Sequence, residues 1–115
     1  MLARRIILEL VEAYNPDEHV PFKKRLGRCY ELAGRFASGN QGCFLVHGTV
    51  QGFGKPPLEH AWVELEDSTV FEPSTNKIYP AEVFNAIFNP QPAARYSHQG
   101  VLKHSLKHEH WGPWR

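Results

Sequence analysis

Long apolar runs, an excess of one charge, internal repeats and low-complexity stretches are all missing from this 115-residue sequence. Lysine and arginine total 13 against 12 acidic residues, so no one-sided basic field indicates nucleic-acid binding. No apolar segment approaches the roughly 20 residues that cross a bilayer. Charged residues interrupt the N-terminal apolar stretch, which argues against a signal peptide. We therefore expect a cytoplasmic protein without membrane or nucleic-acid partners.

Cysteine is scarce: the sequence has only Cys29 and Cys43. A chain without a secretion signal is expected to keep such residues as free thiols. A sequence of this length supports one modest hydrophobic core, so residues 1–115 are predicted to form a single domain.

Hydrophobic periodicity predicts helices separated from a group of strands. Helices are expected at residues 2–14, 28–37, 80–88 and 98–108. Strands are expected at residues 43–50, 58–65 and 69–72, with a further short strand at 77–79. Because helices and strands do not alternate, the fold class is α+β, an antiparallel sheet packed against an N-terminal helix pair with C-terminal helices.

The segment between the two C-terminal helices, Asn89-Pro90-Gln91-Pro92, is predicted to be a hinge. Ser97 is placed to cap the last helix. That helix is expected to turn Val101, Leu102 and Leu106 toward the core.

A hairpin at residues 58–72 organises the candidate site. His60 to Leu65 alternates in the manner of a half-buried strand, and residues 66–68 form a polar three-residue loop. Leu65 then pairs with Thr69, which puts His60 and Glu72 on one face as diagonal neighbours. A carboxylate at Glu72 can reach the imidazole from there, whereas a register slip of one residue would separate them. The hairpin pattern by itself is explained equally well if His60 and Glu72 are surface side chains that do not interact.

Cys29 stands in the first turn of the second predicted helix, where the helix dipole favours a thiolate. A neighbouring imidazolium favours the thiolate further, and a carboxylate behind the imidazole fixes its orientation. Cys29, His60 and Glu72 supply these three groups, and Arg28 adds a positive charge. The alternative for Cys29 is a small buried hydrophobe, the commonest role of a free cysteine.

Three motifs resemble the transglutaminase-like and papain-like cysteine enzyme superfamily. They are Cys-Tyr-Glu-Leu-Ala from residue 29, His-Ala-Trp-Val-Glu from residue 60 and Val-Phe-Glu-Pro-Ser-Thr from residue 70. Together with the Gly-Pro-Trp tail, they also resemble small bacterial and phage proteins. The resemblance implies a papain/transglutaminase-like core in which Cys29 attacks an acyl carbon, His60 is the base and Glu72 orients it. Glu72 stands where the family usually has aspartate, which adds one methylene group.

Other parts of the site are less defined by the sequence. The backbone N–H of Cys29 is a natural oxyanion donor at a helix start, and Gln41 or Gln51 is a candidate side-chain donor. Trp62, on the His60 face of the strand, is a candidate wall of a substrate cleft, or simply part of the core. These residues make up the predicted substrate-binding set.

Cys43 opens an apolar strand, so we interpret it as structural, and His47 in the same strand is a minor alternative to His60 as the base. His104, His108 and His110 offer a different chemistry, because the i, i+4 spacing and the nearby Glu109 suit zinc. The competing interpretation is a solvated helix end whose basic residues complement the dipole.

The sequence therefore favours a cysteine-dependent acyl-transfer enzyme: an amide or isopeptide hydrolase, a deamidase or a transamidase. Its expected substrate is a protein, peptide or small amide, with no cofactor and no metal. The alternative is a catalytically inactive protein-binding module of the same fold. The oligomeric state stays open.

Overall fold

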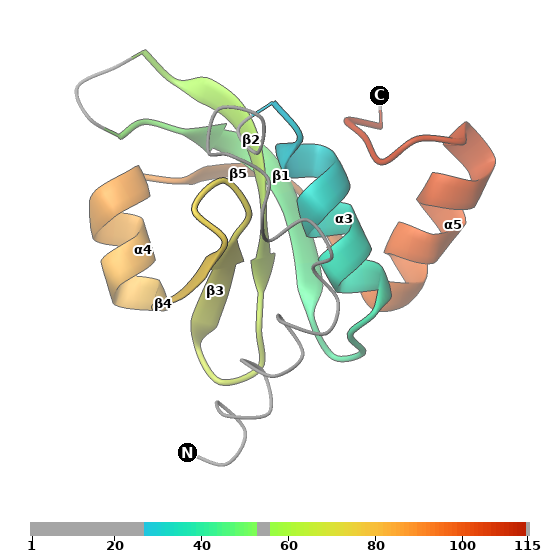
Figure 1. Cartoon of the computed structure of the whole chain (residues 1–115), viewed down its shortest axis with the longest axis horizontal. Helices are drawn as coiled ribbons and strands as arrows, with labels where there is room; N and C mark the ends of the chain where they lie inside the picture. The colour runs from blue at the N-terminus through green and yellow to red at the C-terminus, as the bar shows by residue number, and fades with distance from the viewer. Residues whose placement is uncertain (1–26, 53–55, 115) are drawn as a thin grey trace.

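A computed structural model of the chain describes residues 27–52 and 56–114 (Figure 1). The helix predicted at residues 2–14 lies outside this part. The described elements, in chain order, are α3 (Cys29–Ser38), β1 (Phe44–Val50), β2 (Leu58–Glu64), β3 (Thr69–Glu72), β4 (Lys77–Pro80), α4 (Ala81–Phe88), β5 (Gln91–Ser97) and α5 (His98–His108). In this part of the chain no helix is both long and apolar enough to span a membrane.

The five strands form one antiparallel sheet in the order β4-β3-β2-β1-β5. Hairpin connections link β1 to β2, β2 to β3 and β3 to β4, while β5 returns after α4 to pair with the free edge of β1 (Figure 1). The predicted α+β class and antiparallel sheet are confirmed.

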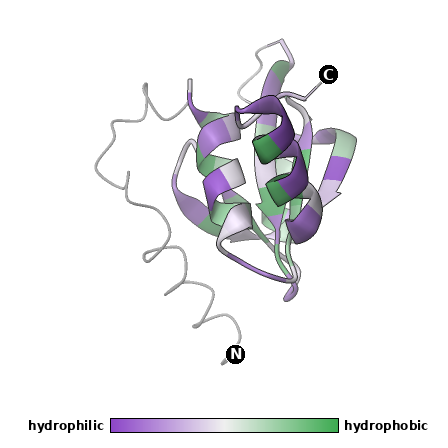
Figure 2. Cartoon of the chain, turned by 90° about the vertical axis from the view of Figure 1, so that its right-hand side faces the viewer, coloured by the Kyte–Doolittle hydropathy of each residue, from purple (hydrophilic) through white to green (hydrophobic). Residues whose placement is uncertain are grey.

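Helices cover both faces of the sheet. On one face α3 and α5 lie side by side, and Phe36 and Val101 meet Leu45 and Val63 there (Figure 2). On the other face α4 packs Phe84 against the sheet. The prediction of a half-buried strand at residues 60–65 was wrong, because α4 covers the face that was expected to meet water.

Strand β5 was not predicted, and the hinge expected at residues 89–92 overlaps its start. It pairs with β1 from Ser97 opposite Phe44 to Gln91 opposite Thr49. Pro92 is tolerated because β5 is an edge strand, where one row of N–H groups needs no partner. Gly48 permits the pairing, since a Cβ there would collide with the carbonyl oxygen of Gln91.

Helix α5 begins as predicted, with the Ser97 hydroxyl accepting a 3.1 Å hydrogen bond from the N–H of Gly100. Only Val101 of its predicted apolar side is buried. Leu102 and Leu106 are 39% and 79% exposed, so their predicted inward orientation was wrong. The helix lies at the border of the molecule and contacts α3 and β5 along one side only, so a narrow stripe of apolar residues is enough for its packing.

Aromatic rings hold the C-terminal tail against the sheet. The buried ring of His47 lies 4.8 Å from that of Tyr30, 5.0 Å from Tyr96 and 5.2 Å from Trp114, measured between centroids. Its Nε2 has no hydrogen-bond partner in the described part of the chain. Burial, assisted by the nearby His104, lowers the pKa of His47 to about 4. The cluster therefore holds a neutral histidine.

We expect the free energy of unfolding to fall by on the order of 1–2 kcal/mol between pH 7 and pH 5 through His47 alone. Its folded pKa is depressed, so across this range the unfolded chain binds a proton that the folded chain excludes. Urea unfolding at the two pH values measures the fall.

A variant with His47→Gln should lose less stability on the same pH change, because its position 47 does not titrate. The matched control is His110→Gln, which removes an exposed histidine from the same end of the molecule. An equal fall in the wild type and in His47→Gln would contradict a neutral buried His47.

Candidate active site

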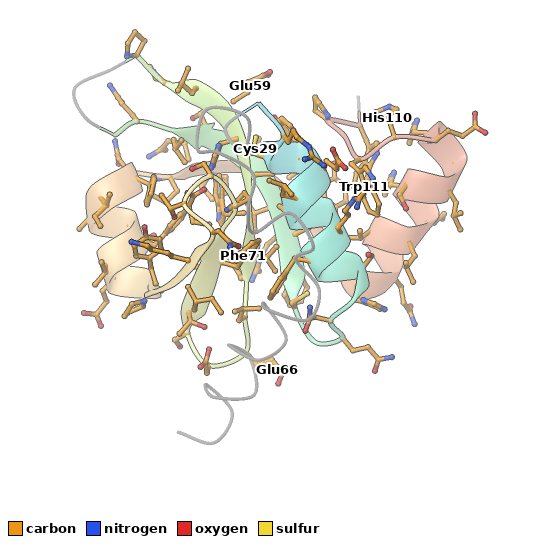
Figure 3. All side chains as sticks on the ribbon, viewed as in Figure 1. Cys29, Glu59, Glu66, Phe71, His110 and Trp111 are labelled. Atoms are coloured by element: carbon orange, nitrogen blue, oxygen red, sulfur yellow. The ribbon has the colours of Figure 1, made fainter. Side chains whose placement is uncertain are left out.

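Cys29 is the first residue of α3, as the sequence predicted. The helix buries Leu32, Ala33 and Phe36 against the sheet, and this packing fixes its first turn beside β2. In Figure 3 Cys29 is labelled at the same end of the molecule as Glu59, the neighbour of His60, and far from Glu66. The side chain of Cys29 is only 5% exposed.

Arg28 does not present an unpaired charge to Cys29. Its guanidinium forms two hydrogen bonds with the carboxylate of Glu31, at 2.8 and 2.9 Å, and Arg35 pairs with the same carboxylate at 2.8 Å. The expected contribution of Arg28 to the thiolate is therefore offset by an adjacent acid.

The hairpin from β2 to β3 has the predicted register. The N–H of Leu65 donates to the carbonyl of Thr69 at 2.9 Å across the three-residue loop. Val63 then lies opposite Phe71. This register brings His60 to Glu72: Nε2 of the imidazole lies 2.8 Å from Oε2 of the carboxylate.

His60 links the other two predicted site residues. The carboxylate of Glu72 is hydrogen-bonded to its ring, and Cys29 lies close enough to help raise the pKa of the imidazole. Because Nε2 is held by Glu72, Nδ1 is the nitrogen that can exchange a proton with the thiol. His60 is 2% exposed and Glu72 is fully buried, so the pair interacts out of contact with water.

The electrostatics of the site favour a charged pair. Burial alone would lower the pKa of His60, but the hydrogen bonds and charges of Cys29 and Glu72 outweigh burial and raise the pKa to about 9. Burial likewise favours a protonated Glu72, yet His60 and Ser74 hold the pKa of that carboxyl below its usual value. At neutral pH the site therefore contains an imidazolium beside a carboxylate.

The turn after β3 supplies further contacts that the sequence analysis missed. Oε2 of Glu72 accepts a 2.8 Å hydrogen bond from the N–H of Ser74, and Oε1 accepts one from the N–H of Thr75 at 2.8 Å. The hydroxyl of Ser74 also donates to Oε1. A hydroxyl residue two positions after an acid, with proline between, is the sequence signal that points to such a turn.

The candidate oxyanion donors are not equally placed. Gln41 follows the C-terminal end of α3, and a ten-residue helix is about 15 Å long, so it does not reach Cys29. Gln51 is exposed directly after β1, and its backbone N–H donates to Phe88 at 2.8 Å. The backbone N–H of Cys29, at the start of α3, remains the candidate oxyanion donor.

Trp62 is a core residue that also lines a cavity. It is 1% exposed, and its ring centroid lies 5.6 Å from that of Phe84. The adjoining cavity of about 710 Å³ is bordered by Phe44, Glu64 and Arg95. None of Cys29, His60 and Glu72 borders this cavity.

The second cysteine and the alternative base lie in other surroundings. Cys43 is buried, and its thiol donates to the carbonyl of Asn40 at 2.9 Å. Burial raises the pKa of Cys43 to about 11. His47 sits in the aromatic cluster, and among the described residues His60 is the histidine that is paired with a carboxylate.

The C-terminal histidines stack without converging. The rings of His104 and His108 are parallel with centroids 5.8 Å apart, and Nδ1 of His110 accepts a hydrogen bond from the N–H of Gly112. Among residues 27–52 and 56–114, no three histidine, cysteine or acidic side chains are arranged to hold a metal ion. The zinc alternative has no geometric support there.

Comparison of the chain with protein-family models, with curated proteins and with solved structures finds no match. The resemblance to papain-like and transglutaminase-like enzymes therefore stays a prediction from the motifs.

The two cysteines should differ in reactivity. We expect iodoacetamide to modify Cys29 at least about tenfold faster than Cys43 near neutral pH, since only a thiolate reacts and the raised pKa of Cys43 keeps it protonated. Peptide mapping by mass spectrometry after timed labelling measures both rates.

The Cys43→Ala variant is the control for this comparison, because its labelling reports Cys29 alone. Equal and slow modification of both cysteines in the folded wild type would contradict an activated Cys29.

Proposed function

We propose that this chain is a cysteine-dependent acyl-transfer enzyme with Cys29 as nucleophile, His60 as general base and acid, and Glu72 as the orienting carboxylate. The buried hydrogen bond between His60 and Glu72, with the Cys29 thiol close enough to act on the same imidazole, is the observation that carries the proposal. A nucleophile, a base within reach and a third group that orients the base are the parts nucleophilic catalysis requires.

In the first half-reaction, the sulfur of Cys29 attacks the acyl carbon of an amide and the carbonyl electrons move to oxygen. The backbone N–H of Cys29, at the start of α3, is the proposed donor to this oxyanion. The His60 imidazolium then gives its Nδ1 proton to the leaving nitrogen. The C–N bond breaks, an amine or ammonia departs, and a thioester on Cys29 remains.

In the second half-reaction, neutral His60 takes a proton from water or from an acceptor amine as that molecule attacks the thioester. The C–S bond breaks and the Cys29 thiolate is restored beside the imidazolium. Water as acceptor gives amide or isopeptide hydrolysis or deamidation, and an amine gives transamidation. The substrate class is a protein, peptide or small amide.

The architecture supports the same proposal. The family resemblance implies a core in which a helix packs on an antiparallel sheet and carries the nucleophile in its first turn. Two neighbouring strands of that sheet carry the base and the acid, as β2 and β3 do here. We propose that α3 and strands β1 to β3 form this papain/transglutaminase-like core.

A catalytically inactive protein-binding module is the second candidate, and burial of the site favours it. The three residues are 5%, 2% and 0% exposed. The two candidates differ in one respect that can be measured, which is turnover of an acyl donor.

We expect hydrolysis of the generic acyl donor p-nitrophenyl acetate to fall to the uncatalysed rate in Cys29→Ala and in His60→Ala. The double variant should be scarcely worse than either, because the two residues act as one unit. Glu72→Gln keeps the shape but removes the charge that stabilises the imidazolium, so it should lower kcat about a hundredfold or more.

The control is Cys43→Ala, which should keep turnover while losing some stability through the packed sulfur. Loss of all turnover in folded Cys43→Ala, or wild-type turnover in Cys29→Ala, would overturn the assignment of the nucleophile. No turnover in the wild type with any of several acyl donors would favour the binding module.

A further inference from the structure

The carboxylate of Glu72 receives four hydrogen bonds, more than its contact with His60 requires. One comes from the imidazole, two from the backbone N–H groups of Ser74 and Thr75, and one from the Ser74 hydroxyl. Two donors reach each oxygen, so the hydrogen-bonding capacity of a buried carboxylate is filled. Ser74 alone contributes two of the four.

The arrangement follows from the length of the side chain. Glutamate is one methylene longer than the aspartate expected at this position, and here the carboxylate folds back over its own turn, residues 72–75, instead of extending away. A flexible carboxylate of this length needs donors on the side opposite the imidazole to hold it in place. Ser74, which is 4% exposed, supplies one to each oxygen.

We propose that Ser74 is a positioning residue of the site: its hydroxyl and N–H hold the Glu72 carboxylate in the orientation that directs Oε2 at Nε2 of His60. Held in this way, Oε2 fixes the Nε2–H tautomer of neutral His60 and leaves Nδ1 toward Cys29. A catalytic consequence of this role rests on the proposed function. Ser74 would then be a residue outside the triad that the reaction needs.

The nearby hydroxyls of Thr75 and Tyr79 bond to each other and not to Glu72. The Thr75 hydroxyl accepts a 3.0 Å hydrogen bond from the phenol of Tyr79, and no hydroxyl other than that of Ser74 bonds to Glu72 in the described part of the chain. Tyr79 of β4 therefore offers a matched deletion: Tyr79→Phe removes a hydroxyl that bonds to the turn without removing a donor to the carboxylate.

The test is an NMR titration of the His60 side chain in folded protein, with ¹⁵N-labelled histidine. The wild type is expected to titrate at about 9. Ser74→Ala should lower the pKa of His60 by about one unit, because a carboxylate that is no longer held in place turns away from Nε2 and stabilises the imidazolium less well. Ser74→Thr keeps the hydroxyl and should restore the wild-type titration.

Tyr79→Phe should leave the His60 titration unchanged. An unchanged titration in Ser74→Ala would overturn the positioning role, because it would show no coupling between the Ser74 hydroxyl and His60. An equal shift in Tyr79→Phe would also overturn it, because loosening the turn by any route would then have the same effect. Should Ser74→Ala not fold, Ser74→Cys keeps the size and weakens the donor. That variant should then show a shift in the same direction.

The experiment separates this inference from the proposed function. A shifted His60 pKa in Ser74→Ala together with an unreactive wild-type Cys29 would retain the positioning role and reject the enzyme. A reactive Cys29 with no effect of Ser74→Ala on the His60 titration would retain the enzyme and reject the positioning role.

Discussion

The 2.8 Å hydrogen bond between His60 and Glu72 determines how the middle of the sheet is assembled, because both side chains lie out of water. Removing one partner of a buried ion pair typically costs about 3–5 kcal/mol, so the register of β2 against β3 is strongly constrained. A slip of one residue would bury two uncompensated charges. The same constraint presents Nδ1 of His60 to the first turn of α3, where Cys29 lies.

The two faces of the sheet contribute differently to this arrangement. Helix α4 covers the face that carries Trp62 and contributes to the lining of the cavity, while α3 packs on the other face. The C-terminal tail braces α3 from outside: Trp111 lies over Gly34, where a Cβ would come within 2.5 Å of the ring.

The sequence predicted the parts of the site that depend on local pattern. Alternation in β2 and a three-residue loop determined the register of His60 and Glu72, and amphipathic spacing placed Cys29 at a helix start. Strand β5 was missed because Pro92 argues against a strand unless the strand lies at an edge, and sequence does not reveal edges. The burial of the Trp62 face and the contacts of Ser74 depend on tertiary packing and on how a carboxylate folds over its turn.

The central claim is that Cys29 forms a thioester with His60 as its proton partner, and acyl-enzyme trapping tests it most directly. The protein is mixed with p-nitrophenyl acetate, quenched in acid within the first turnover, and mapped by mass spectrometry. The account predicts an acetyl group on Cys29 in the wild type and in Cys43→Ala, and none on that residue in His60→Ala. Equal acetylation of Cys29 with and without His60, or acetylation confined to Cys43 and lysines, would contradict it.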